Sequence, residues 1–137
     1  MLVSEAMGGP VDTCAADATM AEAAEQMTNE DHGALPVTWH GCLIGMITER
    51  DILKAVARGS NPEETKVDEL MTPYPDFVEP DLSVEDAANW MLAAGYRHLP
   101  IIDDGKILGI LSMKDVMWAL TGGTEGTRPR SGNGSRS

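Results

Sequence analysis

Two stretches of this sequence decide its fold: LPVTWHGCLIGMITERD at residues 35–51 and LPIIDDGKILGILSMKD at residues 99–115. Each has a short apolar run, a turn ending in glycine, a second apolar run, and a hydroxyl residue followed three positions later by aspartate. Two apolar runs around a glycine turn predict a pair of strands joined by a hairpin. Thr48 and Ser112 precede apolar residues at helical spacing, so they predict the N-caps of two helices.

The similarity between the two stretches extends in both directions at a constant offset of 64 residues. Residues 3–59 align with residues 67–123 without a gap, and 15 of these 57 positions are identical. A gapless match of this length indicates an internal duplication. The sequence therefore predicts one repeat over residues 1–59, a linker over residues 60–66, and a second repeat over residues 67–123.

Each repeat contains two further predicted elements ahead of its hairpin. Residues 13–15 and 77–79 are short extended pieces, and Thr19 and Ser83 are candidate N-caps of helices whose apolar residues recur at helical spacing. The predicted order is strand, helix, strand, strand, helix, twice over. A repeat of 57 residues is marginal alone because it buries too little apolar surface. We therefore expect an α/β (α+β) fold in which both repeats form one module.

The composition excludes several classes of function. The chain has 137 residues and a net charge of −12, so the phosphate backbone of a nucleic acid polymer would be repelled. No apolar run approaches the roughly 18 residues of a membrane span, and the N-terminus does not resemble a signal peptide. Two cysteines do not make a disulfide framework, which favours a cytoplasmic location.

The last 14 residues differ from the rest of the chain. Residues 124–137 contain three arginines and one acidic residue, and they lack Val, Ile, Leu, Met and aromatic residues. A segment of this composition cannot bury apolar surface, so we predict a disordered basic tail. The tail is either an inert end or a contact for an acidic partner.

No constellation typical of an enzyme or a metal site is visible. The three histidines, His32, His40 and His98, do not combine with Cys14 and Cys42 in the paired spacing of a zinc site. Cys14 has no partnered base that would make it a nucleophile. We therefore predict no catalytic residues and no metal.

Taken together, these features resemble the CBS domain pair, also called the Bateman module, over residues 3–120. Residues 45–51 and 109–115 both fit the family's nucleotide motif, which is Gly, apolar, any, Thr or Ser, any, any, Asp. Leu35-Pro36-Val37 and Leu99-Pro100-Ile101 resemble the family's Leu-Pro-Val strand. Glu69-Leu70-Met71-Thr72 resembles the segment that precedes a CBS unit, and Glu5-Ala6-Met7 is a weaker copy of it.

The resemblance implies two β-α-β-β-α repeats packed as one pseudo-two-fold module. It also implies a regulatory, energy-sensing role in which adenosyl ligands such as AMP, ADP, ATP or S-adenosylmethionine bind in two clefts between the repeats. No cofactor is required in such a module. Asp51 and Asp115 would accept hydrogen bonds from the ribose hydroxyls, and the helix N-termini beside Thr48 and Ser112 would face a phosphate. The alternative is that these four residues form capping boxes only.

By the family's pattern, each cleft takes its aspartate from one repeat and its strand residues from the other. The first predicted cleft contains Thr48, Asp51, Phe77, Val78, Arg97, His98 and Lys114. The second contains Ser112, Asp115, Thr13, Cys14, Gly33, Ala34 and Arg50. Because the first set has more basic side chains, we expect it to favour phosphorylated nucleotides. The second set should prefer a nucleoside or bind weakly.

Three classes of function follow. The first is a stand-alone adenine-nucleotide sensor that acts on an unknown effector protein. The second is a structural dimerisation module that binds no ligand, and the third, disfavoured by the absence of a nucleophile with its base, is an enzyme. The resemblance implies a homodimer formed through the helices, and the candidate interface positions are Met20, Ala24, Trp90, Trp118 and the C-terminal helix. Trp90 and Trp118 align with Gln26 and Lys54, which suggests that both tryptophans are partly exposed at an interface. The alternative is that they make a lateral contact within the core.

Overall fold

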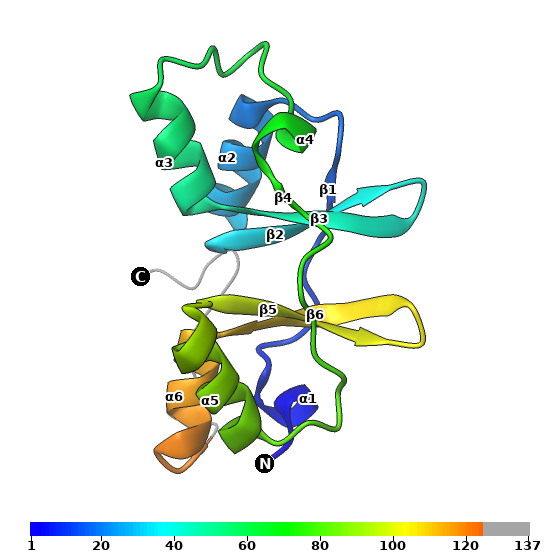
Figure 1. The fold of residues 1–137 in the computed structure, drawn as a ribbon, viewed down its shortest axis with the longest axis vertical. Helices are drawn as coiled ribbons and strands as arrows, with labels where there is room; N and C mark the ends of the chain where they lie inside the picture. Colours follow the sequence, from blue (N-terminus) through cyan, green and yellow to red (C-terminus); the bar gives the residue numbers. More distant parts are fainter. Residues whose placement is uncertain (125–137) are drawn as a thin grey trace. The chain divides into compact units, whose positions relative to one another are not determined.

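The computed structural model describes residues 1–124, which form two compact units (Figure 1). The continuous unit is Asp12–Pro75. The split unit combines Met1–Val11 with residues 76–124. The predicted basic tail, apart from Thr124, lies outside the described residues.

The continuous unit is a four-stranded sheet with two longer helices and one short helix. The strands have the order β1-β2-β3-β4, in which β1 is parallel to β2 and the other neighbours are antiparallel. The helices α2 and α3 pack against each other. In chain order the elements are β1 (Cys14–Ala15), α2 (Met20–Glu30), β2 (Ala34–Trp39), β3 (Cys42–Thr48), α3 (Glu49–Ala57), α4 (Val67–Leu70) and β4 (Thr72–Pro73).

The split unit repeats this plan with a smaller sheet. Its two strands form an antiparallel hairpin, and its helices α5 and α6 pack against each other (Figure 1). In chain order the elements are α1 (Val3–Ala6), α5 (Val84–Ala94), β5 (His98–Asp103), β6 (Lys106–Ser112) and α6 (Met113–Leu120).

Both hairpins turn as the sequence predicts. His40 and Gly41 join β2 to β3 with φ angles of 53° and 81°, and Asp104 and Gly105 join β5 to β6 with φ angles of 51° and 78°. Two consecutive residues with positive φ make the type I′ turn, whose twist matches that of the flanking strands. Glycine at the second position adopts this conformation without the steric cost of a side chain.

The four predicted N-caps are confirmed. The side-chain oxygens of Thr19, Thr48, Ser83 and Ser112 each accept a hydrogen bond from the backbone N–H three residues later. Such a bond satisfies one of the N–H groups that the first turn of a helix leaves without an intrahelical partner.

One predicted strand is absent. Residues 77–79 form no strand, although Val78 makes a single parallel bridge to Ile101. In the continuous unit the corresponding pairing of β1 with β2 continues for another hydrogen bond, in which Ala16 donates its N–H to the carbonyl of Thr38 at 3.0 Å. The residue aligned with Ala16 is Pro80, which has no N–H to donate. The ladder therefore stops at one bridge.

The short helices α1 and α4 were not predicted, and each packs with the other sequence repeat. Val3 of α1 donates its N–H to the carbonyl of Leu82 at 2.9 Å, and Val84 donates to the carbonyl of Met1 at 2.9 Å. In the continuous unit, Val67 of α4 donates its N–H to the carbonyl of Ala18 at 2.8 Å. Each compact unit thus combines most of one repeat with the leading helix of the other.

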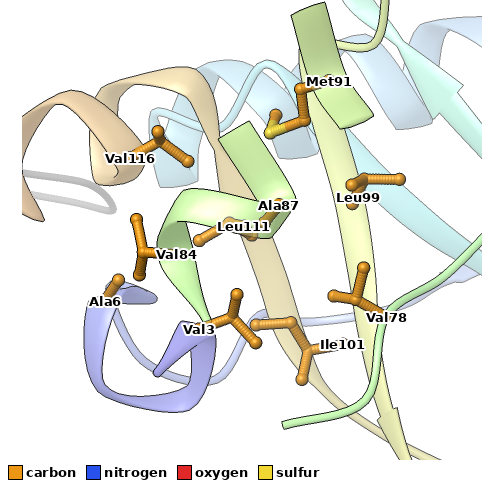
Figure 2. Packing of buried hydrophobic residues seen from close by; sticks show 10 residues of the cluster. All are labelled: Val3, Ala6, Val78, Val84, Ala87, Met91, Leu99, Ile101, Leu111 and Val116. Carbon is orange, nitrogen blue, oxygen red and sulfur yellow. The ribbon is translucent and has the colours of Figure 1, made fainter. Parts of the chain in front are cut away.

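The core of the split unit is built around α1. Figure 2 shows Val3 and Ala6 lying among side chains from α5, β5 and β6, and both residues are completely buried. The cluster consists of Val3, Ala6, Val78, Val84, Ala87, Met91, Leu99, Ile101, Leu111 and Val116. Removing α1 would expose this apolar surface to water, at a cost that scales with its area.

Two of the four candidate interface positions are buried within the chain. Met20 is 2% exposed and Trp118 is 6% exposed. The predicted partial exposure of Trp118 is therefore wrong, and its burial fits the alternative of a contact within the core. The indole N–H of Trp118 donates to the carbonyl of Thr124 at 2.8 Å, which lets the polar end of the ring be buried. Trp90 is partly buried and lies edge-on to Tyr96, with ring centroids 5.9 Å apart.

None of the helices within residues 1–124 is both long enough and apolar enough to cross a membrane.

Substituting Val3→Ala tests the contribution of α1 to the core. It removes two buried carbon atoms and leaves a cavity, so we expect a loss of about 2 kcal/mol in the free energy of unfolding. Denaturant unfolding followed by circular dichroism measures this loss. The neighbouring variant Ser4→Ala, at a partly exposed position of the same helix, should change stability by less than about 0.5 kcal/mol. Equal effects of the two variants would contradict burial of α1.

Candidate functional site

The first candidate site lies at the start of α3. Thr48 accepts a hydrogen bond from the Asp51 N–H at 3.2 Å, and the Asp51 carboxylate accepts bonds from the Thr48 N–H at 2.8 Å and the Thr48 hydroxyl at 3.1 Å. This is a reciprocal capping box. Both bonds to the carboxylate use Oδ2, so the box itself does not use Oδ1.

The second candidate site lies at the start of α6 and has the same construction. Ser112 accepts from the Asp115 N–H at 3.2 Å, and Oδ2 of Asp115 accepts from the N–H and hydroxyl of Ser112, both at 2.9 Å. Asp115 is only 8% exposed, whereas Asp51 is partly exposed. A capping box is therefore present in both repeats, and it fixes the direction of each carboxylate.

The residues that start β2 and β5 lie beside these helix starts. Ala34 is the register partner of Thr48, and His98 is the register partner of Ser112. The carbonyl of Gly33 accepts the Glu49 N–H at 2.9 Å, and the carbonyl of Arg97 accepts the Met113 N–H at 3.0 Å. In each unit, a hydroxyl residue, an aspartate and the first residues of a Leu-Pro strand therefore lie together at the start of a helix.

The predicted ligand residues divide between the two units. The continuous unit holds Thr13, Cys14, Gly33, Ala34, Thr48, Arg50 and Asp51. The split unit holds Phe77, Val78, Arg97, His98, Ser112, Lys114 and Asp115. Arg50, Arg97 and Lys114 are exposed, as a contact with a dissolved anion requires. Each cleft implied by the resemblance draws on both units, so the pairing of the sets remains a prediction.

The glycine that opens each motif is required by a close approach. A methyl group on Gly45 would meet the Met71 sulfur and would lie 2.9 Å from the carbonyl oxygen of Thr72. A methyl group on Gly109 would lie 2.9 Å from both the Met7 sulfur and the Gly9 carbonyl oxygen. The segments after the leading helices thus cross the motif strands in close contact, which ties each motif to the core of its unit.

The environment of Cys14 makes its thiol unreactive. Its side chain is 2% exposed, and burial, followed by the charges of Glu22 and Glu30, raises the pKa of the thiol to about 11. The thiolate is the nucleophilic form of cysteine, so this thiol is unreactive near neutral pH. Cys14 can line a ligand site as a small apolar side chain.

Among residues 1–124, no group of three or more His, Cys, Asp or Glu side chains is placed to hold a metal ion.

Sequence reasoning missed one residue at the first site. The Glu49 carboxylate lies over Gly33, so that a methyl group on Gly33 would be 3.3 Å from both Cδ and Oε1 of Glu49. The alignment of the repeats contains the signal, because the pair Gly33 and Glu49 aligns with the pair Arg97 and Met113. Only the structure shows that the two members of each pair are neighbours.

Comparison with known proteins gives a consistent result. The family model described as "CBS domain" matches residues 3–58 and 67–122. The CBS domain-containing protein YhcV of Bacillus subtilis is 36% identical over 115 residues, which cover 83% of this chain and 81% of YhcV. Two further curated relatives are longer, and the matched regions span 39% and 62% of their lengths.

Two solved structures with a similar fold contain adenosyl ligands. The CBS domain pair of protein MJ0100, in complex with 5′-methylthioadenosine and S-adenosyl-L-methionine, superposes with a TM-score of 0.79 and 28% identity, covering 90% of this chain and 98% of that chain. The protein CBSX2 in complex with AMP superposes with a TM-score of 0.75 and 25% identity, covering 88% of this chain and 96% of that chain.

The burial of Cys14 predicts a difference in alkylation between the two cysteines. At pH 8, which is below the raised pKa of about 11, the Cys14 thiol stays protonated and covered, whereas Cys42 is exposed. Iodoacetamide should therefore add one label to the native protein, at Cys42, and two labels to the denatured protein, as measured by mass spectrometry of peptides. Native Cys42→Ser protein should take up no label. Rapid labelling of Cys14 in that variant would contradict its burial.

Proposed function

The chain belongs to the CBS-domain family, with two CBS domains in tandem, and on that premise we propose that it is a regulatory module that binds an adenosyl ligand and signals to a partner protein. The observation that carries this proposal is the pair of capped helix starts, each with a carboxylate held in a fixed direction beside a Leu-Pro strand. The adenosyl complexes of MJ0100 and CBSX2 support the class of ligand.

The binding chemistry follows from the groups at the helix starts. A nucleoside offers two neighbouring ribose hydroxyls, and a carboxylate accepts charge-assisted hydrogen bonds from them. Asp51 can do so through Oδ1 while Oδ2 continues to cap α3. The ligand then meets a carboxylate that the fold has already oriented, so little side-chain entropy is lost on binding.

The charges of the two proposed residue sets differ. Arg97, His98 and Lys114 accompany Asp51 in the first set, and we propose that this set holds a phosphorylated ligand such as AMP, ADP or ATP. The second set has Gly33 and Ala34 in place of Arg97 and His98, and Arg50 in place of Lys114. We propose that this set holds a nucleoside or S-adenosylmethionine. The position of the module in the cytoplasm, its non-enzymatic role and an energy-sensing role belong to the same proposal.

The second candidate function is a dimerisation module that binds no ligand. This function is favoured by apolar side chains that are exposed on the longer helices, where they could contact another protein surface. Leu53 and Val56 of α3 are 68% and 58% exposed, and Leu92 of α5 is 72% exposed. Met117 of α6 is 64% exposed. Whichever function holds, we propose that these side chains, in place of Met20 and Trp118, form contacts with a second copy of the chain.

Ligand binding is tested by thermal unfolding with AMP, ATP, NADH and S-adenosylmethionine. A ligand at 100 times its Kd adds about 2.7 kcal/mol to stability, which raises Tm by several degrees. The variant Asp51→Asn keeps an oxygen for the cap but loses the charge, so we expect AMP binding to weaken at least tenfold.

Asp115→Asn should weaken AMP binding less than Asp51→Asn does, and Asp68→Asn, an exposed aspartate in α4, should not change it. A greater loss from Asp115→Asn would contradict the assignment of phosphate to the first set. If no ligand raises Tm at millimolar concentration, the second candidate function is favoured.

The oligomeric state is tested by sedimentation at about 100 μM protein. We expect a dimer for the wild type, because the exposure of apolar helix side chains to water is unfavourable and a dimer interface would cover them. The variant Met117→Glu should shift the protein towards the monomer by placing a charge in the apolar contact. Trp39→Gln serves as the matched control, since Trp39 is 48% exposed at the end of β2, next to the hairpin turn. A monomeric wild type would contradict the proposal.

A further inference from the structure

We propose that Asp12, Glu30 and His32 form a pH-sensitive latch, which holds the first residues of the continuous unit against the end of α2 more firmly in weakly acidic than in neutral solution. Asp12 is the first residue of that unit and lies just before β1. The latch belongs to one unit and involves no ligand. The inference therefore goes beyond the proposed function and does not rest on it.

The segment before β1 lies along the C-terminal half of α2. The Gln26 amide donates a hydrogen bond from Nε2 to the carbonyl of Thr13 at 3.2 Å. One turn further along the helix, the Glu30 carboxyl is within hydrogen-bonding reach of Asp12 and of the Gln26 amide. Side chains four positions apart lie on the same face of a helix. Gln26 and Glu30 therefore hold two consecutive residues of the segment.

The split unit has a contact between the aligned positions. Asp76 aligns with Asp12, and Tyr96 aligns with His32. The Tyr96 hydroxyl donates a hydrogen bond to the Asp76 carboxylate, and this bond raises the pKa of Tyr96 above the alkaline value that is ordinary for a phenol. The split unit therefore keeps its contact protonated at neutral pH. Only the continuous unit builds the contact from groups that can titrate below neutrality.

Three titratable side chains face the Glu30 carboxyl. They are Asp12 from the segment before β1, His32 from the turn after α2, and the thiol of Cys14 from β1. Partial burial, followed by the charge of Asp12, raises the pKa of Glu30, whereas the charge of His32 lowers it. The Cys14 thiol has its own pKa raised to about 11, so it stays uncharged in weakly acidic and neutral solution.

The charge of the latch changes with pH in one direction. In weakly acidic solution, protonated Glu30 donates a hydrogen bond to the Asp12 carboxylate, and cationic His32 balances the remaining negative charge. Histidine loses its charge between about pH 5 and 8. When both protons are lost, two carboxylates face each other without a cation, and the contact is repulsive. A carboxyl whose pKa is raised in the closed latch favours closure below that pKa, and this contribution is lost as the pH rises through it.

Amide hydrogen exchange of the full-length protein at about pH 5 and pH 7.5 tests the latch. The Ala16 N–H, which bonds to the carbonyl of Thr38, reports on the latched segment. The Val78 N–H, which bonds to the carbonyl of Pro100, reports on the matching segment of the split unit. Protection factors remove the effect of pH on the intrinsic exchange rate. Protection of Ala16 should fall about fivefold at the higher pH, the order of one unit-charge repulsion at 4 Å in water, and that of Val78 by less than about twofold.

Matched variants identify the groups that titrate. Glu30→Gln keeps a side chain that can donate to Asp12 but cannot ionise, so the fall in protection at Ala16 should vanish. Glu25→Gln removes a carboxylate from an exposed position of the same helix and should leave the fall unchanged. In an NMR titration of the side-chain carboxyl carbons, Asp12→Asn should move the midpoint of Glu30 towards lower pH, because the neighbouring negative charge is gone.

Each measurement has an outcome that contradicts the latch. Equal protection of Ala16 at both pH values overturns the inference, as does a fivefold fall that persists in Glu30→Gln. Parallel losses at Ala16 and Val78 also overturn it, because they would indicate a change in the stability of the whole chain. An unchanged Glu30 midpoint in Asp12→Asn would show that the two carboxyls do not interact, which removes the basis of the latch.

Discussion

The burial of α1 is the interaction on which the split unit depends. Val3 and Ala6 are completely buried among residues that lie more than 70 positions away in the sequence. The entropy cost of joining such distant segments grows only slowly with their separation, and it is offset by the apolar surface that α1 covers. Leu111 of β6 and Val116 of α6 belong to the same core (Figure 2). The position of α6, which begins with the Ser112–Asp115 capping box, therefore depends on this contact.

The capping boxes give each motif aspartate a structural role that does not require a ligand. A chain could keep Thr48 and Asp51 only to begin α3, and the motif would look the same. What distinguishes a binding site from a cap is the chemistry beside it. In this chain that chemistry is unequal, because Arg97 stands beside one helix start and Gly33, covered by Glu49, stands beside the other. The two repeats thus contain two similar helix starts with different charged side chains beside them.

Much of the fold was predictable from local patterns in the sequence. The hairpins, the helices α2, α3, α5 and α6, and their four N-caps each have a signal within about ten residues. The four-residue helices α1 and α4 have no such signal, because a single turn shows no periodicity and its stability comes from distant packing partners. The loss of the strand at residues 77–79 depends on one missing N–H at Pro80, which could have been noticed in the sequence.

The site was predictable in its residue types but not in its contacts. The motif placed Thr48, Asp51, Ser112 and Asp115 at helix starts, as the structure confirms. The exposure of Trp118 was predicted wrongly, because comparison with Lys54 could not show that the indole would find a partner at the Thr124 carbonyl. The position of Glu49 over Gly33 required the structure, since the antiparallel register of β2 and β3 brings the two residues together and the path of the Glu49 side chain places its carboxylate there.

The division of the chain into a continuous and a split unit also has a consequence for how the protein folds as it leaves the ribosome. Asp12–Pro75 is complete once its last residue has emerged, so it can fold while the rest is still being made. Residues 1–11 emerge before this unit, yet their packing partners from residue 76 onward emerge after it. During that interval α1 has no core to join, and a single turn of helix is not stable alone. Residues 1–11 are therefore expected to reach their native positions after the continuous unit, although they are synthesised before it.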